Sequence, residues 1–264
     1  MFAHLTRLSV ALVLVSPLVG ALPAQGIEYA PGTTKFHVSS AMTGSQTTPA
    51  GTANFEVGLD ERLTLNLMKH AKDTVMATMT LDTISIKSGG PTPDISKLMG
   101  AKFVSLVSPT GKFYSVKAPE GIDPQLASIT EGLGKFLPAI RGKLTKGQTW
   151  IDTVSAKVNQ MGMEVDRTTI SNFTVEGDTI VNGEKAIKIA RSASAKGVGA
   201  GNMQGTPVTM EMTGVGNGAF YITPMGAYLG GLSKDDVQIK LTVLVQNMEI
   251  TIKQNGTTKI EAIK

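Results

Sequence analysis

The chain has 264 residues, a formal net charge of +4, 41% hydrophobic residues and 5% aromatic residues. It contains no cysteine, which excludes disulfides, thiol nucleophiles and cysteine-ligated zinc. The basic residues are scattered and aromatic side chains are sparse, so we expect no nucleic-acid interface.

Residues 1–25 have the features of a signal peptide. Arg7 is their only charged residue and precedes the apolar run LSVALVLVSPLVGAL, which is shorter than the about 20 residues of a membrane span. No cysteine follows that could carry a lipid. We therefore expect a periplasmic or secreted, non-lipidated protein with no transmembrane segment after cleavage. Residues 26–264 are predicted to form a single β-rich domain. A retained N-terminal anchor is the alternative.

An apolar–polar alternation with a period of two dominates the rest of the chain and predicts strands. Leu63, Leu65 and Leu67 alternate with polar residues, and a change of phase at Asp82-Thr83 is typical of a β-bulge. AKFVSLVSPTGKFYSV predicts two strands joined by a Pro-Thr-Gly turn, and Asn182-Gly183 predicts a hairpin.

One segment, DPQLASITEGLGKFLPAI at 123–140, has helical spacing instead. Asp123 is suited to the N-cap and Pro124 to the first helical position. The sequence predicts one central amphipathic helix here, although two glycines and Pro138 weaken it. The apolar residues at helical spacing are Leu126, Ile129, Leu133, Phe136, Leu137 and Ile140.

Polar segments rich in glycine, proline and threonine are predicted to be loops. They cover residues 43–53, 88–94 and 194–207. The adjacent acidic pairs Asp60-Glu61 and Asp235-Asp236 are predicted to lie in solvated turns between strands.

Four methionines form two pairs at strand spacing, Met161 with Met163 and Met210 with Met212. Residues two apart in a strand share a face, so each pair points to one side. Three interpretations are open. The pairs could be core residues, because methionine fills irregular gaps, or an adaptable wall for an apolar ligand. They could also be ligands of Cu(I), which suits thioether sulfur. No histidine is near either pair, which ranks copper last.

Residues suited to catalysis or metal binding are few. Beyond residue 25 only His37 and His70 are present, and both are expected to face solvent. The motifs H-E-x-x-H, G-x-S-x-G and S-x-x-K are absent. A Ser–His–Asp triad assembled from distant residues would make the chain an unrecognised hydrolase. We predict no catalytic residues, no metal site and no cofactor.

Two short segments resemble motifs of an uncharacterised family of exported bacterial β-rich proteins. They are SPTGKFYSV at 108–116 and LTKGQTW at 144–150. Members of that family show a central G-D-x-W motif, which corresponds here to Gly147, Gln148 and Trp150, with Gln148 in place of aspartate. The resemblance covers most of residues 26–264 and implies no known activity.

The architecture also resembles that of lipoprotein carriers, the LolA-like half-barrels. That resemblance implies a curved sheet whose apolar concave face is covered by the 123–140 helix as a lid.

The predicted fold class is all-β to α+β. It is a curved antiparallel sheet or incomplete barrel of roughly ten to twelve strands, with one central amphipathic helix on the concave face. We expect a non-enzymatic protein that binds or carries an apolar, lipid-like ligand in the cell envelope. A structural or interaction protein with a filled core is the alternative, and a hydrolase ranks third. The predicted ligand-binding residues are Leu133, Phe136, Leu137, Met161, Met163, Met210 and Met212.

Overall fold

The structure is a computed structural model that describes residues 26–88, 94–117, 136–160, 163–203, 205–246 and 248–263. These residues form eleven strands and one short 3-10 helix, η1 (Ser96–Leu98). The strands are β1 (Gly32–Thr48), β2 (Gly51–Ala71), β3 (Thr74–Ser88), β4 (Lys102–Val107), β5 (Phe113–Lys117), β6 (Thr149–Gln160), β7 (Met163–Val181), β8 (Glu184–Met203), β9 (Thr206–Ile222), β10 (Tyr228–Val243) and β11 (Met248–Ile263).

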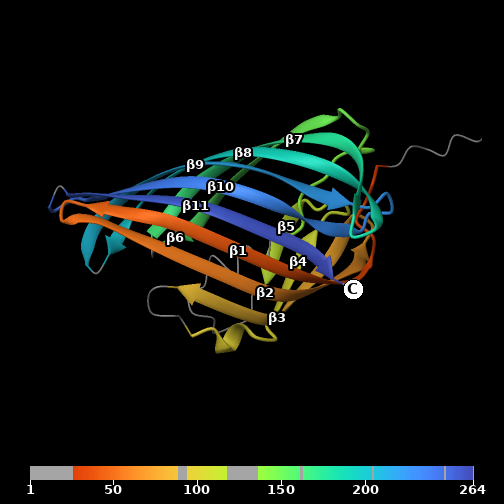
Figure 1. Ribbon diagram of the computed structural model, residues 1–264, viewed down its shortest axis with the longest axis horizontal. Coiled ribbons are helices and arrows are strands. Elements are labelled where there is room, and N and C mark those ends of the chain that lie inside the picture. The colour runs from red at the N-terminus through yellow and green to blue at the C-terminus, as the bar shows by residue number, and fades with distance from the viewer. Residues whose placement is uncertain are drawn as a thin grey trace, which may run out of the picture.

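All eleven strands belong to one antiparallel sheet in the order β5-β4-β3-β2-β1-β11-β10-β9-β8-β7-β6. Consecutive strands pair throughout, except that β5 does not pair with β6. At the centre of the sheet the first and last strands meet, where β1 pairs with β11 over thirteen residue pairs from Lys35–Ile263 to Thr47–Thr251. The sheet is open, with β5 and β6 at its edges, and Figure 1 shows it strongly curved. The predicted all-β antiparallel sheet that does not close is therefore confirmed.

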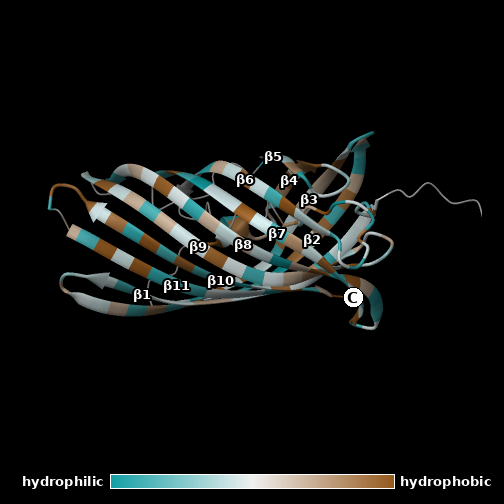
Figure 2. Ribbon diagram, turned by 90° about the horizontal axis from the view of Figure 1, so that it is seen from above, coloured by the Kyte–Doolittle hydropathy of each residue, from teal (hydrophilic) through white to brown (hydrophobic). Residues whose placement is uncertain are grey.

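The period of two in the sequence separates two faces of the sheet. In β2, Leu63, Leu65 and Leu67 are buried while the residues between them are exposed or half-buried. Figure 2 shows the same alternation of apolar and polar residues along the other long strands. We call the face that carries the buried residues the inner face.

Three local predictions are confirmed. The register of β2 with β3 shifts between Arg62–Thr83 and Leu63–Leu81, which leaves Asp82 as the extra residue of a bulge. Strands β4 and β5 pair across the Pro-Thr-Gly turn. Strands β7 and β8 join at Asn182-Gly183, whose φ angles of 51° and 81° match a type I′ hairpin turn.

Two predicted loops are wrong. Residues 43–53 belong mostly to β1 and β2, which turn tightly at residues 49–50, and residues 194–203 continue β8. The glycines of β8 suit a strand here because neighbouring side chains fill their space. A Cβ on Gly199 would lie 2.8 Å from Val165 Cγ2, and one on Gly201 would lie 2.8 Å from Met163 Cγ. In the third predicted loop, residues 89–93 lie outside the described residues.

The acidic pairs are also not in turns. Asp60-Glu61 lies within β2 and Asp235-Asp236 within β10. In each pair one carboxylate faces inward, because successive residues of a strand point to opposite faces. Glu61 is only 5% exposed.

The predicted helix at 123–140 is not supported. Residues 123–135 lie outside the described residues, and Phe136–Ile140 are not helical. Pro138 provides no backbone N–H, and its carbonyl accepts a hydrogen bond from the Tyr29 hydroxyl at 2.7 Å. The backbone N–H of Ile140 donates to Thr110 O at 2.8 Å. The segment is held by contacts with distant residues instead of by helical hydrogen bonds. Residues 1–25, the predicted signal peptide, also lie outside the description.

The buried side chains of the inner face form two separate clusters. The larger, cluster 1, lies at one end of the sheet and includes Phe36, Leu63, Ile189 and Phe220. The smaller, cluster 2, comprises Met163, Val165, Val208, Met210, Met212, Ile239, Leu241, Val243 and Ile252. No helix in the described ranges has the length and apolar character needed to cross a membrane.

Candidate functional site

Small and polar residues separate the two apolar clusters on the inner face. Along β9 the inward positions are apolar at Val208, Met210 and Met212 and again at Phe220 and Ile222. The inward positions between Met212 and Phe220 are Gly214, Gly216 and Gly218. The register places small or polar residues beside these glycines on β8, β10, β11 and β1. We call this set the central belt; it comprises Arg191, Ala193, Ala195, Gly214, Gly216, Gly218, Ser233, Asp235, Gly256, Thr258 and Ser40.

Of the three belt glycines of β9, Gly214 leaves open space, whereas Asp235 covers Gly216 and the backbone of Leu232 and Ser233 approaches Gly218 closely. A Cβ on Gly214 would make only ordinary contacts, the nearest at 3.4 Å from Val237 Cγ2 and Asp236 O. A Cβ on Gly216 would overlap the Asp235 carboxylate. Glycine at 216 therefore gives Asp235 room to lie over the sheet, whereas glycine at 214 leaves its position open.

Three cavities adjoin one another along the inner face. Cavity A has a volume of about 370 Å³, cavity B about 310 Å³ and cavity C about 380 Å³. Phe136 lines both A and B, and Arg191 lines both B and C. Each volume lies at the lower end of the range of about 300–1,000 Å³ that is typical of small-molecule sites.

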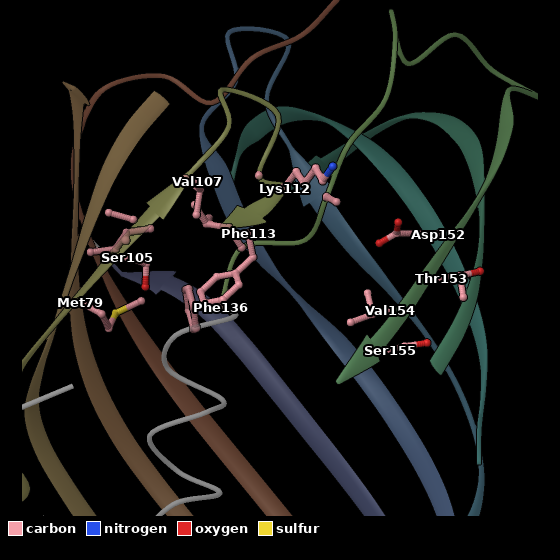
Figure 3. Close-up of a pocket in the computed structure, with 15 residues that line it drawn as sticks. Met79, Ser105, Val107, Lys112, Phe113, Phe136, Asp152, Thr153, Val154 and Ser155 are labelled. Carbon is pink, nitrogen blue, oxygen red and sulfur yellow. The ribbon is translucent and has the colours of Figure 1, made fainter. Parts of the chain in front are cut away.

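Cavity A lies where the sheet does not close. Its walls come from Val107 and Phe113 on one edge of the sheet and from Asp152 to Ser155 of β6 on the other. Figure 3 shows Phe136 between these two walls, beside Phe113 and Val107. The opening between the sheet edges thus gives access to the interior.

Two groups of aromatic side chains flank cavity B. Trp150 stacks on Phe173 with ring centroids 5.0 Å apart, and Phe173 contacts Phe220 edge to face at 6.0 Å. On the other side, Phe136 contacts Phe36 at 5.0 Å and Tyr228 at 5.7 Å. Burial raises the pKa of the Tyr228 hydroxyl, which therefore stays protonated.

Arg191 is the charged residue of the cavity B wall. It is half-buried on β8, opposite Phe173 of β7 and Gly218 of β9. Its Nε donates to Ser171 Oγ at 3.3 Å. Among the described residues no carboxylate forms an ion pair with it. Asp235, together with a second arginine, Arg167, shares the wall of cavity C.

A second inward ionisable group, Glu61, lies apart from the cavities. It faces Val38 of β1 and Ile84 of β3, and its Oε1 is buried without a hydrogen-bond partner. Burial, and next the negative charge of Asp60, raise the pKa of Glu61 from 4.5 to about 7.

The predicted ligand-binding residues fall into three groups. Leu133 and Met161 lie outside the described residues. Phe136, Leu137 and Met212 line cavities. Met163 and Met210 are each 1% exposed within cluster 2 and line none of the three cavities. The structure therefore places the second group at the cavities and the third in the packed cluster 2, and the binding roles stay predictions.

The two histidines lie outside these cavities. His37 Nε2 is 2.8 Å from Asp60 Oδ2 on the outer face, and no described hydroxyl group bonds to that imidazole. His70 is exposed at the end of β2. Within the described ranges, no group of three or more histidine, aspartate or glutamate side chains is arranged to hold a metal ion.

The motif residues at 108–116 and 147–150 have structural contacts. Ser108 Oγ accepts hydrogen bonds from the backbone N–H of Thr110 at 3.3 Å and Lys112 at 2.9 Å, which closes the β4–β5 turn. The Gln148 side chain donates to Arg141 O at 2.7 Å. Trp150 is buried in cluster 1.

Sequence analysis missed Arg191, the belt glycines and the inward position of Asp235. A signal was present: Arg191 falls on the same phase as Ile187 and Ile189, and Gly214, Gly216 and Gly218 fall on the same phase as Met212 and Phe220. Arginine and glycine interrupt the apolar alternation at these positions, which hides the regularity.

Comparison with known proteins identifies no family. No family model matches the sequence, and no curated protein does. Among solved structures the chain is similar to an "outer membrane lipoprotein-sorting protein domain" from Vibrio parahaemolyticus, at 10% identity. That similarity covers 86% of this chain and 83% of the other, with a TM-score of 0.19. So low a score does not establish a common fold, and both resemblances noted in the sequence stay predictions.

Proposed function

We propose that this protein binds an apolar, lipid-like ligand on the inner face of its sheet and carries it in the cell envelope. The observation that carries the proposal is the row of three adjoining cavities along that face. The walls of cavities A and B are mainly apolar and aromatic with few polar groups, which is the composition typical of small-molecule sites, and cavity C continues them with small, polar and charged residues. The envelope location rests on the predicted signal peptide at residues 1–25.

The opening between the sheet edges supports entry of such a ligand. Cavity A lies there, and Phe136 separates it from cavity B. A flexible apolar chain would enter beside Phe113 and extend past Phe136 toward the central belt. Burial of its methylene groups would contribute about 0.8 kcal/mol each.

The experiment has two parts. Organic extraction of the protein purified from its native envelope, followed by mass spectrometry, should release a lipid-sized compound. The extracted protein should then bind N-phenyl-1-naphthylamine, an uncharged apolar fluorophore, with an increase in fluorescence.

A matched pair of variants locates the binding. Gly214→Leu adds a side chain in cavity C where a Cβ is tolerated, and it should lower the affinity for the fluorophore at least tenfold. Gly58→Leu adds the same side chain on the outer face of β2, where a Cβ would be 3.6 Å from Lys87 Cβ, and should leave the affinity unchanged. An empty extract together with no fluorophore binding by the wild type would contradict the proposal.

A structural protein with a filled interior is the second candidate. The observation that favours it is the close packing of cluster 2, in which Met163 and Met210 are each 1% exposed. Under this alternative the wild type binds no fluorophore, and Gly214→Leu changes stability alone.

A further inference from the structure

We propose that the ligand is an anionic amphiphile whose acidic head group, a carboxylate or a phosphate, binds to Arg191. This inference rests on the proposed function and specifies its ligand class. Arg191 would hold the head group at the central belt, and the apolar chain would lie among the aromatic side chains of cavity B.

The first argument is the unused hydrogen-bonding capacity of Arg191. A guanidinium has five N–H donors and no acceptor. One of them, Nε–H, donates to the neutral Ser171 hydroxyl at 3.3 Å. In the described part of the chain no carboxylate lies within ion-pair distance of Arg191. A half-buried arginine without a counter-ion is costly, and an anionic ligand would supply that counter-ion.

The second argument is the chemistry around it. Ser233 of β10 and Thr258 of β11 lie in the same transverse row as Arg191, across Gly218, and both line cavity B. The Ser233 hydroxyl is a further donor for an acidic oxygen, and so is the hydroxyl pair of Thr258 and Ser40, whose oxygens are 3.0 Å apart and share one hydrogen bond. Glycine at 218 leaves this row without a side chain between the guanidinium and the hydroxyl groups.

The third argument is the placement of apolar surface beside the charge. Phe173 is the direct cross-strand neighbour of Arg191, and Phe220, Tyr228 and Phe136 complete the wall of cavity B. A cavity of about 310 Å³ whose wall joins one cationic group to several aromatic rings matches a molecule with one charged end and an apolar chain.

A carboxylate and a phosphate can each accept two parallel hydrogen bonds from a guanidinium. The test therefore uses three single-chain probes of equal chain length: dodecanoate, dodecyl phosphate and dodecanol. Each competes with N-phenyl-1-naphthylamine for the extracted wild-type protein. We expect at least one of the two anions to bind about ten- to a hundredfold more tightly than dodecanol, as charge-assisted hydrogen bonds imply, and the better anion identifies the head group.

Arg191→Gln should remove that preference while dodecanol and the fluorophore bind as before. Arg191→Lys, which keeps the charge but not the paired donors, should retain part of it. Arg62→Gln changes an exposed arginine on the outer face of β2 and should have no effect. Thermal unfolding of each variant shows that it is folded, and Arg191→Lys provides a second test should Arg191→Gln fail to fold.

The outcomes separate the two proposals. If the wild type binds the fluorophore but does not distinguish dodecanol from either anion, the inference about Arg191 is overturned and the apolar-ligand function stands. An anion preference that persists in both Arg191 variants also overturns the inference. If the wild type binds neither the fluorophore nor any of the three amphiphiles, both proposals are overturned.

Discussion

At the scale of single residues, Glu61 places an ionisable group in the hydrophobic interior of the sheet. Its neighbours on β1 and β3 are Val38 and Ile84, and its Oε1 has no hydrogen-bond partner. The folded protein therefore favours the protonated acid, whereas the unfolded chain releases the proton at an ordinary pKa. Folding and protonation are coupled at this position.

We predict that Glu61 makes the free energy of unfolding fall as pH rises from 4.5 to about 7. In this window the folded state binds the proton and the unfolded state does not. Below pH 4.5 Glu61 is protonated in both the folded and the unfolded state, so the cost of burying a charged carboxylate is absent. Above about pH 7 the full cost of roughly 3 kcal/mol applies, at about 1.36 kcal/mol per pKa unit.

Glu61→Gln should therefore raise the free energy of unfolding at pH 8 by up to about 3 kcal/mol and change it little at pH 4. Urea unfolding at a series of pH values measures both effects. Glu56→Gln, an exposed carboxylate on the same strand, is the control. If the free energy of unfolding of Glu61→Gln still falls between pH 4.5 and about 7 as it does in the wild type, another group dominates the pH dependence there.

At the scale of the strand, β9 combines two kinds of inward position. Met210 and Met212 pack in cluster 2, while the three inward positions that follow are glycines of the central belt, of which Gly214 leaves open space. Met212 also lines cavity C, so it lies at the boundary between the packed and the open parts. Strand β9 thus contributes both packed core residues and part of the proposed binding-site wall.

We predict that Met210 contributes to stability and not to ligand affinity. Met210→Ala should lower the free energy of unfolding by about 2–5 kcal/mol, because it opens a hole in a packed core. Met210→Leu nearly conserves volume and should cost less than about 1.5 kcal/mol. Chemical denaturation measures both, and Met225→Ala, at a side chain that is 83% exposed, is the control. Full stability with lost fluorophore binding in Met210→Ala would instead favour the ligand-wall interpretation.

The sequence predicts the positions of the strands better than it predicts which residues line the inner face of the sheet. Alternation identifies the strands and, by its change of phase, the Asp82 bulge, while local turn chemistry predicts the Asn182-Gly183 hairpin. Glycine-rich 194–203 interrupts the alternation, but it continues β8 because Val165 and Met163 of β7 fill the space above the glycines. That information comes from the neighbouring strand, so no local pattern contains it. The inward arginine and the belt glycines do fall on the buried phase of β8 and β9, but they carry no apolar side chain that would mark those positions as inward.

At the scale of the whole molecule, strand order and chain order differ at one place. If the chain began with β6, continued to β11, and went on from β1 to β5, every strand would be the neighbour of the next one in the chain. The β1–β11 ladder instead joins strands that are more than 200 residues apart, as in the pair Phe36–Ala262. Contacts between residues so distant in sequence slow folding, because the intervening chain must be ordered first.

A circular permutant tests this relation. Joining residues 26 and 264 by a short flexible linker and opening the chain between Lys117 and Ala118 would convert β1–β11 into a local hairpin. We expect the permutant to fold with a similar circular dichroism spectrum and to refold severalfold faster in stopped-flow experiments. An equal or slower refolding rate would mean that the central ladder does not limit folding.

The central position of β11 also has a consequence for biosynthesis. Met248–Ile263 leave the ribosome after the other ten strands, yet they occupy the middle of the finished sheet. Until then β1 and β10 each present an unpaired edge, and exposed strand edges are templates for aggregation. The ten earlier strands cannot complete the sheet before β11 has been synthesised, so we expect the edges of β1 and β10 to be the main sites of aggregation during folding.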